Sequence, residues 1–415
     1  MYRPRVVDQE LTEALRANGA VLIEGPRGCG KTATARQTAA SEVLLDVDAD
    51  ARQAAALDPG LILDGAAPRL LDEWQIVPAV WNHVRRAVDD APSPGRFILT
   101  GSAVPSDDLT RHTGALRIGR LRMRPMSLFE QGASTGAISL AALLAGDPAR
   151  SPDTGLSIPD LARRVAIGGW PALLERSADQ ALRALRGYLD DVARVDLTRV
   201  DGVARDPDRV SRLLRSLARN VATPVAAATL AADTGGAEGA LKDETVAGYL
   251  AALARLLIVE DQPAWVPHLR SRSVLRLGAK RHFVDPSLAV AALRATPELL
   301  LRDLNLLGLL FESLVVRDLR VYSQSVDARV LHYRDNTGLE VDAIVERADG
   351  AWAAFEIKLG PVLIEDGAAS LLRFARRVDT TKTGPPALLG VIVGTGFGYV
   401  RPDGVAVIPI GALGP

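Results

Sequence analysis

The chain has 415 residues, of which 48% are hydrophobic and 24% charged, and its formal net charge is −1. This length exceeds one ordinary core, so we expect about two to four globular domains. No apolar run approaches the ~20 residues that span a bilayer, and the first ten residues hold no apolar signal core. The single cysteine excludes an intramolecular disulfide. We therefore expect a cytoplasmic protein without a membrane partner, and the balanced charge gives no whole-chain argument for nucleic acid.

The first motif in chain order is the octapeptide GPRGCGKT at 25–32, which follows the apolar run 20–23 and precedes the Ala-rich segment 32–40. It has the phosphate-loop pattern between a predicted strand and a predicted helix. In such a loop Lys31 reaches the β- and γ-phosphates of ATP and Thr32 ligates Mg²⁺. The alternative is a Gly-rich turn in an unrelated α/β domain. The predicted ATP-binding residues here are Gly25, Pro26, Arg27, Gly28, Cys29, Gly30, Lys31, Thr32 and Ala33.

Two later segments supply further parts of an ATPase. Residues 69–73 read RLLDE, an apolar run that ends in two acids. Asp72 is expected to hold Mg²⁺ and Glu73 to polarise the attacking water, the alternative being a strand that ends in a solvated acidic turn. The next predicted strand, FILTG, carries Thr100, which we expect beside the γ-phosphate as a sensor unless it is a plain turn hydroxyl.

Arginines without acids then follow from residue 111 to residue 124. Arg120 is the preferred candidate for an arginine finger that reaches the nucleotide of a neighbouring subunit, because such a cation neutralises transition-state charge. This interpretation requires a homo-oligomer. A contact with a phosphate backbone and a solvated basic face are the alternatives.

Together these segments resemble a bacterial and archaeal family of AAA-type ATPases that are largely uncharacterised. The resemblance rests on GPRGCGKT, LLDEWQIVP, FILTGSA and GRLRMRPMSLFE, and covers about the first third of the chain. Trp74 stands where the family more usually has a branched aliphatic residue. Family members carry a C-terminal module of unknown function, whose Gly-Gly-aromatic-Pro signature is similar to residues 168–171 (GGWP). The resemblance implies hydrolysis of ATP to ADP and phosphate.

The middle of the chain is predicted to be helical. Apolar residues recur at helical spacing from 161 to 201 and in three later amphipathic segments. A strand and a basic stretch follow, and three helices before a basic hairpin are the outline of a winged helix. We expect this hairpin to contact DNA phosphates, although acids at the start of the third helix would repel them, and winged helices also serve as protein-contact modules. The predicted DNA contacts are Arg270, Arg272, Arg276, Lys280 and Arg281.

The last region holds a second chemical pattern. Glu312 lies on a predicted helix and Asp342 on a predicted strand, and Glu356 and Lys358 share one face of the next strand. The set resembles the nuclease core with a Pro-Asp…Asp/Glu-x-Lys motif, although Val341 replaces the proline. The resemblance implies that the three carboxylates ligate Mg²⁺ or Mn²⁺ and that the lysine orients the nucleophile. The alternative is a vestigial fold that binds DNA or shapes an oligomer without cutting.

The expected fold class is α/β, in four regions: an AAA-type P-loop ATPase domain at 1–133, a linker and helical lid or bridge at 134–205, a winged-helix domain at 206–295, and a restriction-endonuclease-like domain at 296–415. The function that we favour from the sequence is ATP-hydrolysing DNA processing, on branched or duplex DNA. One alternative is an ATP-gated signalling or defence switch that does not cut DNA. Another is a structural DNA-binding factor whose ATPase controls oligomerisation.

Overall fold

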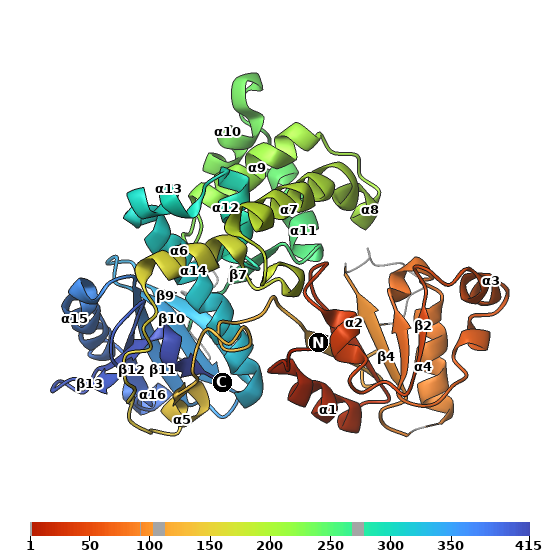
Figure 1. Cartoon of the computed structure of the whole chain (residues 1–415), viewed down its shortest axis with the longest axis horizontal. Coiled ribbons are helices and arrows are strands. Elements are labelled where there is room, and N and C mark those ends of the chain that lie inside the picture. The colour runs from red at the N-terminus through yellow and green to blue at the C-terminus, as the bar shows by residue number, and fades with distance from the viewer. Residues whose placement is uncertain (1, 92, 103–112, 268–277) are drawn as a thin grey trace.

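The computed structural model describes residues 2–91, 93–102, 113–267 and 278–415. Three parts surround a common junction: an N-terminal sheet with its helices, a helical part above, and a C-terminal sheet beside the first (Figure 1). No helix in these ranges combines the length and the apolarity that crossing a membrane requires.

The N-terminal part is a five-stranded parallel sheet in the order β2-β3-β4-β1-β5. Its central strands are apolar and buried, as expected where helices cover both faces of a parallel sheet. Because β4 lies between β1 and β3, the end of β4 separates the loop after β1 from the acids that end β3, at the edge where such sheets bind ligands. The strands are β1 (Ala20–Glu24), β2 (Ser41–Leu44), β3 (Arg69–Asp72), β4 (Phe97–Gly101) and β5 (Ile118–Arg122); the helices are α1 (Val7–Ala17), α2 (Lys31–Ala35), α3 (Ala49–Leu57) and α4 (Val80–Asp90).

The helical part runs from α6 (Ile158–Ile167) to α13 (Pro297–Arg302). Three of its helices precede an antiparallel hairpin, as the sequence predicts; the winged-helix assignment itself stays a prediction. The remaining elements are α7 (Ala178–Asp191), a π-helical turn (Val192–Asp196), α8 (Leu197–Asp201), α9 (Pro207–Arg219), α10 (Ala227–Gly235), α11 (Asp243–Arg255), β7 (Val259–Gln262), β8 (Lys280–Phe283) and α12 (Pro286–Leu293).

The C-terminal part is a six-stranded mixed sheet in the order β13-β14-β12-β11-β10-β9. Strands β9 to β11 are antiparallel, whereas β11, β12 and β14 are parallel. Long, almost wholly buried α14 packs on one sheet face and α15 on the other. The elements are α14 (Leu304–Ser323), β9 (Ala328–Arg334), β10 (Glu340–Arg347), β11 (Trp352–Lys358), α15 (Ile364–Ala375), α16 (Thr380–Thr383), β12 (Leu388–Val393), β13 (Tyr399–Val400) and β14 (Ala406–Pro409).

The start of the predicted linker is anchored rather than free. Strand β6 (Ile138–Ser139) pairs in parallel with β15 (Leu413–Gly414) at the end of the chain. The apolar helix α5 (Leu140–Leu144) follows and buries its leucines in the main core. The sequence predicts a linker here, but the short apolar insert at 140–144 packs against residues far away in the sequence.

A buried ion cluster joins the three parts. Arg317 of α14 donates to Asp285 Oδ2 at 2.7 Å and to Asp318 Oδ1 at 2.6 Å, and its side chain is 1% exposed. Asp318 also accepts the backbone N–H of Leu128, from the segment after β5, at 3.0 Å. Asp285, which caps α12, accepts the backbone N–H of Gly169 at 3.0 Å. One guanidinium therefore fixes the helical part, α14 and the segment that leaves the N-terminal sheet.

We predict that Arg317→Met lowers the free energy of unfolding by about 3–5 kcal/mol, because it leaves two carboxylates buried without a cation. Urea unfolding followed by far-UV circular dichroism measures the change. The matched control is Arg329→Met, which breaks an ion pair with Glu346 whose arginine is 76% exposed and should lower stability by less than about 1 kcal/mol. Equal midpoints for the two variants would remove the cluster from this role.

Candidate nucleotide-binding site

The loop between β1 and α2 has the backbone of a phosphate cradle. Gly30 has φ of 105°, in the left-handed region where a side chain is strained, and directly precedes Lys31 at the start of α2. Gly25 lies against the backbone: an added Cβ would stand 2.5 Å from the carbonyl oxygen of Met123. The predicted helix 32–40 is shorter than expected, because α2 ends at Ala35.

Lys31 is a buried cation without an acidic partner among the described residues. Its side chain donates to the carbonyl oxygens of Gly25 at 3.0 Å and Pro26 at 3.2 Å, and the residue is 5% exposed. A buried charge without a counter-charge is costly. The loop therefore fits an anionic ligand, and a nucleotide phosphate beside the ammonium would supply the missing charge.

The residues predicted to bind Mg²⁺ meet at the same place. Asp72 Oδ1 at the end of β3 accepts a hydrogen bond from Thr32 Oγ1 at 2.8 Å and another from the buried hydroxyl of Thr100 on β4. A hydroxyl and a carboxylate oxygen are ligands that Mg²⁺ prefers. The chemistry of this pair fits the ion that accompanies a nucleotide.

Glu73 adopts a left-handed backbone with φ of 53°, which is unusual for a non-glycine residue. Its backbone N–H donates to Thr100 Oγ1 at 3.2 Å. Its carboxylate accepts from Ser102 Oγ at 3.1 Å and from the side-chain amide of Gln75. This network fixes the direction of the carboxylate, as a water-polarising base requires.

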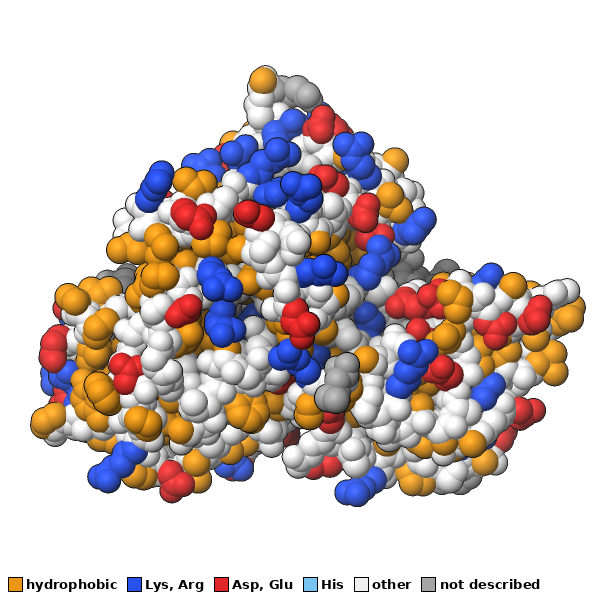
Figure 2. All heavy atoms as spheres, viewed as in Figure 1, with side chains coloured by type: hydrophobic (Ala, Val, Ile, Leu, Met, Phe, Trp, Pro, Cys, Tyr) orange, Lys and Arg blue, Asp and Glu red, His pale blue; other side chains and the backbone are white. Residues whose placement is uncertain are grey.

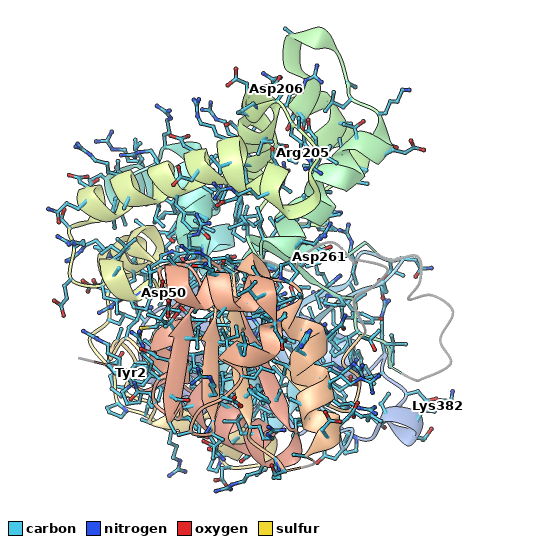
Figure 3. The ribbon with its side chains drawn as sticks, turned by 90° about the vertical axis from the view of Figure 1, so that its right-hand side faces the viewer. Tyr2, Asp50, Arg205, Asp206, Asp261 and Lys382 are labelled. Atoms are coloured by element: carbon cyan, nitrogen blue, oxygen red, sulfur yellow. The ribbon has the colours of Figure 1, made fainter. Side chains whose placement is uncertain are left out.

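Glu73 lines a cavity of about 510 Å³ between the N-terminal sheet and the helical part, and Tyr188 and Arg199 of the helical part also line it. Across this cavity Arg27 of the phosphate loop donates to Asp196 Oδ1, in the π-helical turn, at 3.1 Å. Tyr2, which is labelled in Figure 3, lines a second cavity of about 570 Å³. Gly30 of the phosphate loop lines the same cavity. The loop thus lies between two hollows.

Sequence reasoning missed one residue that holds the loop in place. Arg5 donates to the carbonyl oxygens of Cys29 at 2.9 Å and Arg124 at 2.7 Å, and to Glu130 Oε1 at 3.0 Å. Glu130 in turn accepts from the backbone N–H of Ser127 at 2.7 Å. Ser127 and Glu130, which belong to the motif GRLRMRPMSLFE, thus position the Arg5 guanidinium against the phosphate loop. In the sequence, the signal for Arg5 was its place ahead of the first strand.

Arg120 lies on β5 beside β1, where its guanidinium forms an ion pair with Glu24 at 2.7 Å and stacks over Trp81. Its side chain is half exposed, at 49%. It lines a cleft of about 880 Å³ with Arg122, Arg124 and other residues of the junction. The action of Arg120 on a neighbouring subunit stays a prediction.

The second predicted site is brought together, with one unexpected member. Lys358 on β11 contacts Asp342 Oδ2 on β10 at 3.4 Å and the carboxylate of Glu356. Glu312 on α14 joins the cluster through Lys280, whose Nζ lies 2.8 Å from Glu312 Oε1. Burial raises the pKa of Glu312 to about 8 and that of Glu356 to about 7. Burial lowers the pKa of Lys280, but the surrounding carboxylates outweigh it and hold that pKa above its usual range.

The predicted DNA-contacting residues differ in where the structure places them. Arg270, Arg272 and Arg276 lie outside the described residues. Lys280 is 2% exposed with its charge matched by carboxylates, so it offers no cation to a DNA backbone; this corrects the expectation that it belongs to a basic surface. Arg281 is partly exposed and contacts Asp261 at 3.7 Å and the carbonyl oxygen of Val225 at 3.2 Å.

Comparison with known proteins identifies the N-terminal part. Residues 17–131 match a family described as an AAA domain, and residues 158–299 and 307–413 match two domains of unknown function, DUF8612 and DUF4143. Uncharacterised proteins of Mycobacterium bovis and Mycobacterium tuberculosis are each 26% identical over 357 residues, covering 84% of this chain and 72% of theirs. A solved Walker-type ATPase of Pyrococcus abyssi aligns with a TM-score of 0.41 and 13% identity, over 69% of this chain and 94% of that chain.

The family match and the loop geometry agree that the chain carries an AAA-type P-loop ATPase domain, which confirms that part of the sequence prediction. The roles of individual residues, the domain boundaries and the nature of the two later regions stay predictions.

We predict that Lys31→Ala abolishes nucleotide binding, because it removes the buried cation that faces phosphate. Glu73→Gln should keep ATP affinity within about threefold but lower turnover by about 10²–10⁴-fold, since only the proton acceptor is lost. Equilibrium binding of a fluorescent ATP analogue and steady-state phosphate release measure the two effects. Ser102→Ala, which removes one hydrogen bond to the Glu73 carboxylate, is the milder control. Unchanged turnover in Glu73→Gln would end its role as the base.

Proposed function

We propose that this protein hydrolyses ATP and uses the nucleotide state of its AAA-type domain to drive or gate DNA-directed work by the two later parts. The single observation that supports hydrolysis best is the arrangement of Lys31, Asp72 and Glu73 at one sheet edge. Lys31 is a buried cation that no described acid pairs with. Asp72 accepts a hydrogen bond from the Thr32 hydroxyl, and Glu73 is held by a different hydroxyl, that of Ser102, so the three side chains suit three distinct roles.

The residues divide the work as follows. Lys31 and the loop N–H groups hold the phosphates, and Thr32 with Asp72 would hold Mg²⁺, which screens charge on the phosphate oxygens. Glu73 orients the attacking water and accepts its proton. Thr100 bonds both Asp72 and the Glu73 backbone, so it keeps the two carboxylates in register.

The contact between Arg27 and Asp196 supports coupling to the helical part. Arg27 belongs to the phosphate loop, and its partner lies in a π-helical turn between α7 and α8. A nucleotide in the loop would compete with Asp196 for this guanidinium, because the arginine belongs to the phosphate loop and its side chain is 54% exposed. Binding would then shift the helical part, which is how ATP gates a state in this proposal.

DNA as the partner is supported by exposed arginines rather than by the predicted wing. Figure 2 shows basic side chains gathered over the helical part, with acids among them. Arg183 of α7, and Arg215 and Arg219 of α9, are exposed and form no ion pair with a described acid. Cations that lack protein partners are available to phosphates.

A second candidate function is an ATP-gated switch that acts without DNA. It is favoured by the same link between Arg27 and Asp196, which transmits the nucleotide state without requiring nucleic acid. In that case the output is the arrangement or the assembly state of the chain.

We predict that one form of DNA raises the steady-state ATPase rate. The rate is measured with and without duplex, single-stranded and four-way-junction DNA, beside Lys31→Ala to exclude contaminating ATPases. No stimulation by any of the three would move the proposal to the DNA-independent switch.

The charge-reversed variant Arg215→Glu/Arg219→Glu should weaken DNA binding and reduce the slope of log affinity against log salt by about two, one for each lost phosphate contact. The control Arg16→Glu/Arg86→Glu makes the same change in net charge at exposed sites on the ATPase domain. Equal losses in both variants would show that net charge, not this surface, governs binding.

A further inference from the structure

The carboxylate cluster of the C-terminal part already contains a cation that belongs to the chain. Lys280 Nζ lies 2.8 Å from Glu312 Oε1, 2.8 Å from Glu340 Oε1 and 3.4 Å from Asp342 Oδ1. An ammonium has three N–H donors and no acceptor. Three carboxylate oxygens, from α14 and β10, therefore surround this ammonium, and those of Glu312 and Asp342 accept hydrogen bonds from it.

The other carboxylate oxygen of Asp342 is also engaged. Asp342 Oδ2 accepts the backbone N–H of Ile357 at 2.9 Å and lies 3.4 Å from Lys358 Nζ. A divalent ion needs carboxylate oxygens at about 2.0–2.6 Å, and ammonium groups cannot share that position with it. Within the described ranges, no three acidic, histidine or cysteine side chains form a group that could hold a metal ion. The nuclease-like site as arranged therefore does not fit Mg²⁺ or Mn²⁺.

The position of Lys280 is fixed by the hairpin that carries it. Gln262 on β7 donates to the carbonyl oxygens of Leu331 at 2.9 Å and Asp342 at 3.0 Å. The ring of His282, two residues along β8, bonds Gln262 Oε1 at 3.0 Å and Ser313 Oγ at 3.2 Å. The hairpin is thus docked on α14 and on the sheet, and it presents Lys280 from the same face as His282.

Space for an ion exists beside the cluster. Asp342, Glu356 and Lys358 line a cavity of about 540 Å³, together with Ser370, Arg373 and Arg377. Lys358 is the ammonium on the cavity side of Asp342, and Lys280 lies against the other carboxylate oxygen of Asp342, so a cation of the chain already occupies each side of this carboxylate.

We propose that the ammonium of Lys280 is the resident cation of this cluster, and that the C-terminal part binds no divalent ion there while β8 is docked. Removal of the ammonium leaves Glu312, Glu340 and Asp342 facing one another, and this set of hard oxygens would accept Mn²⁺ or Mg²⁺. The module then contacts or shapes a partner without metal-dependent cleavage. The inference does not depend on ATP hydrolysis, and the ATPase rate of each variant reports that activity separately.

The test is a titration of the nucleotide-free full chain with Mn²⁺, with the free ion read by electron paramagnetic resonance. Wild type and Asp342→Asn should bind equal amounts of Mn²⁺. Lys280→Met, of similar length but uncharged, should bind one additional equivalent, which disappears when Asp342→Asn is added. Lys280→Arg keeps the charge and should gain none. An equivalent in wild type that Asp342→Asn removes would overturn the proposal, as would a folded Lys280→Met chain that gains nothing.

Because Lys280→Met removes the ammonium that three carboxylates share, the variant can be too unstable to titrate. Melting temperature then gives the same answer: 1 mM Mn²⁺ should raise it by several degrees in Lys280→Met, and should leave wild type and Lys280→Arg unchanged. A shift in wild type, or none in Lys280→Met, contradicts the proposal.

Discussion

The architecture depends on one buried guanidinium. Arg317 connects Asp285 at the start of α12 with Asp318 on its own helix, and through their other hydrogen bonds it fixes Leu128 and Gly169. A cation at this depth is tolerable only because both carboxylates and their backbone donors are in place. Since each carboxylate holds a different segment of the chain, loss of the cation would weaken both attachments at once.

The position of the nucleotide site depends on this ion cluster. The backbone of Gly169 makes two hydrogen bonds: its N–H donates to the carboxylate of Asp285, and its carbonyl oxygen accepts from the N–H of Met126 at 2.7 Å. An added Cβ would stand 2.1 Å from the Met126 carbonyl oxygen, so only glycine permits the approach. The next residues, Trp170 and Pro171, pack beside Gly28 and Gly30 of the phosphate loop. The GGWP segment thus contacts both the ion cluster, through Gly169, and the phosphate loop, through Trp170 and Pro171.

The ATPase chemistry was predictable because it is local. The phosphate loop is contiguous, and Asp72 and Glu73 end one apolar run, so this run together with the loop upstream predicted their roles. The alternation of Glu356 and Lys358 similarly predicted a shared strand face, which the structure has. Partners of buried charges could not be predicted, because Arg317 with Asp285, or Arg5 with Glu130, are separated by long stretches of chain. Lys280 was wrongly predicted to lie on a basic surface, because several arginines stand near it in the sequence. Its alternation with His282 on one strand face was the signal that both side chains point inward, and both are buried.

The two buried lysines show what each site can accept. Lys31 and Lys280 are almost equally buried, at 5% and 2% exposure. Lys31 donates to uncharged carbonyl oxygens, whereas Lys280 forms ion pairs with three carboxylates. The first therefore retains an unbalanced positive charge that an anion can satisfy, while the second is already balanced and closes its cluster to a further cation. The same residue type at similar burial thus opens the loop to a nucleotide and shuts the nuclease-like site to a metal, and the difference lies entirely in the partners that the fold supplies.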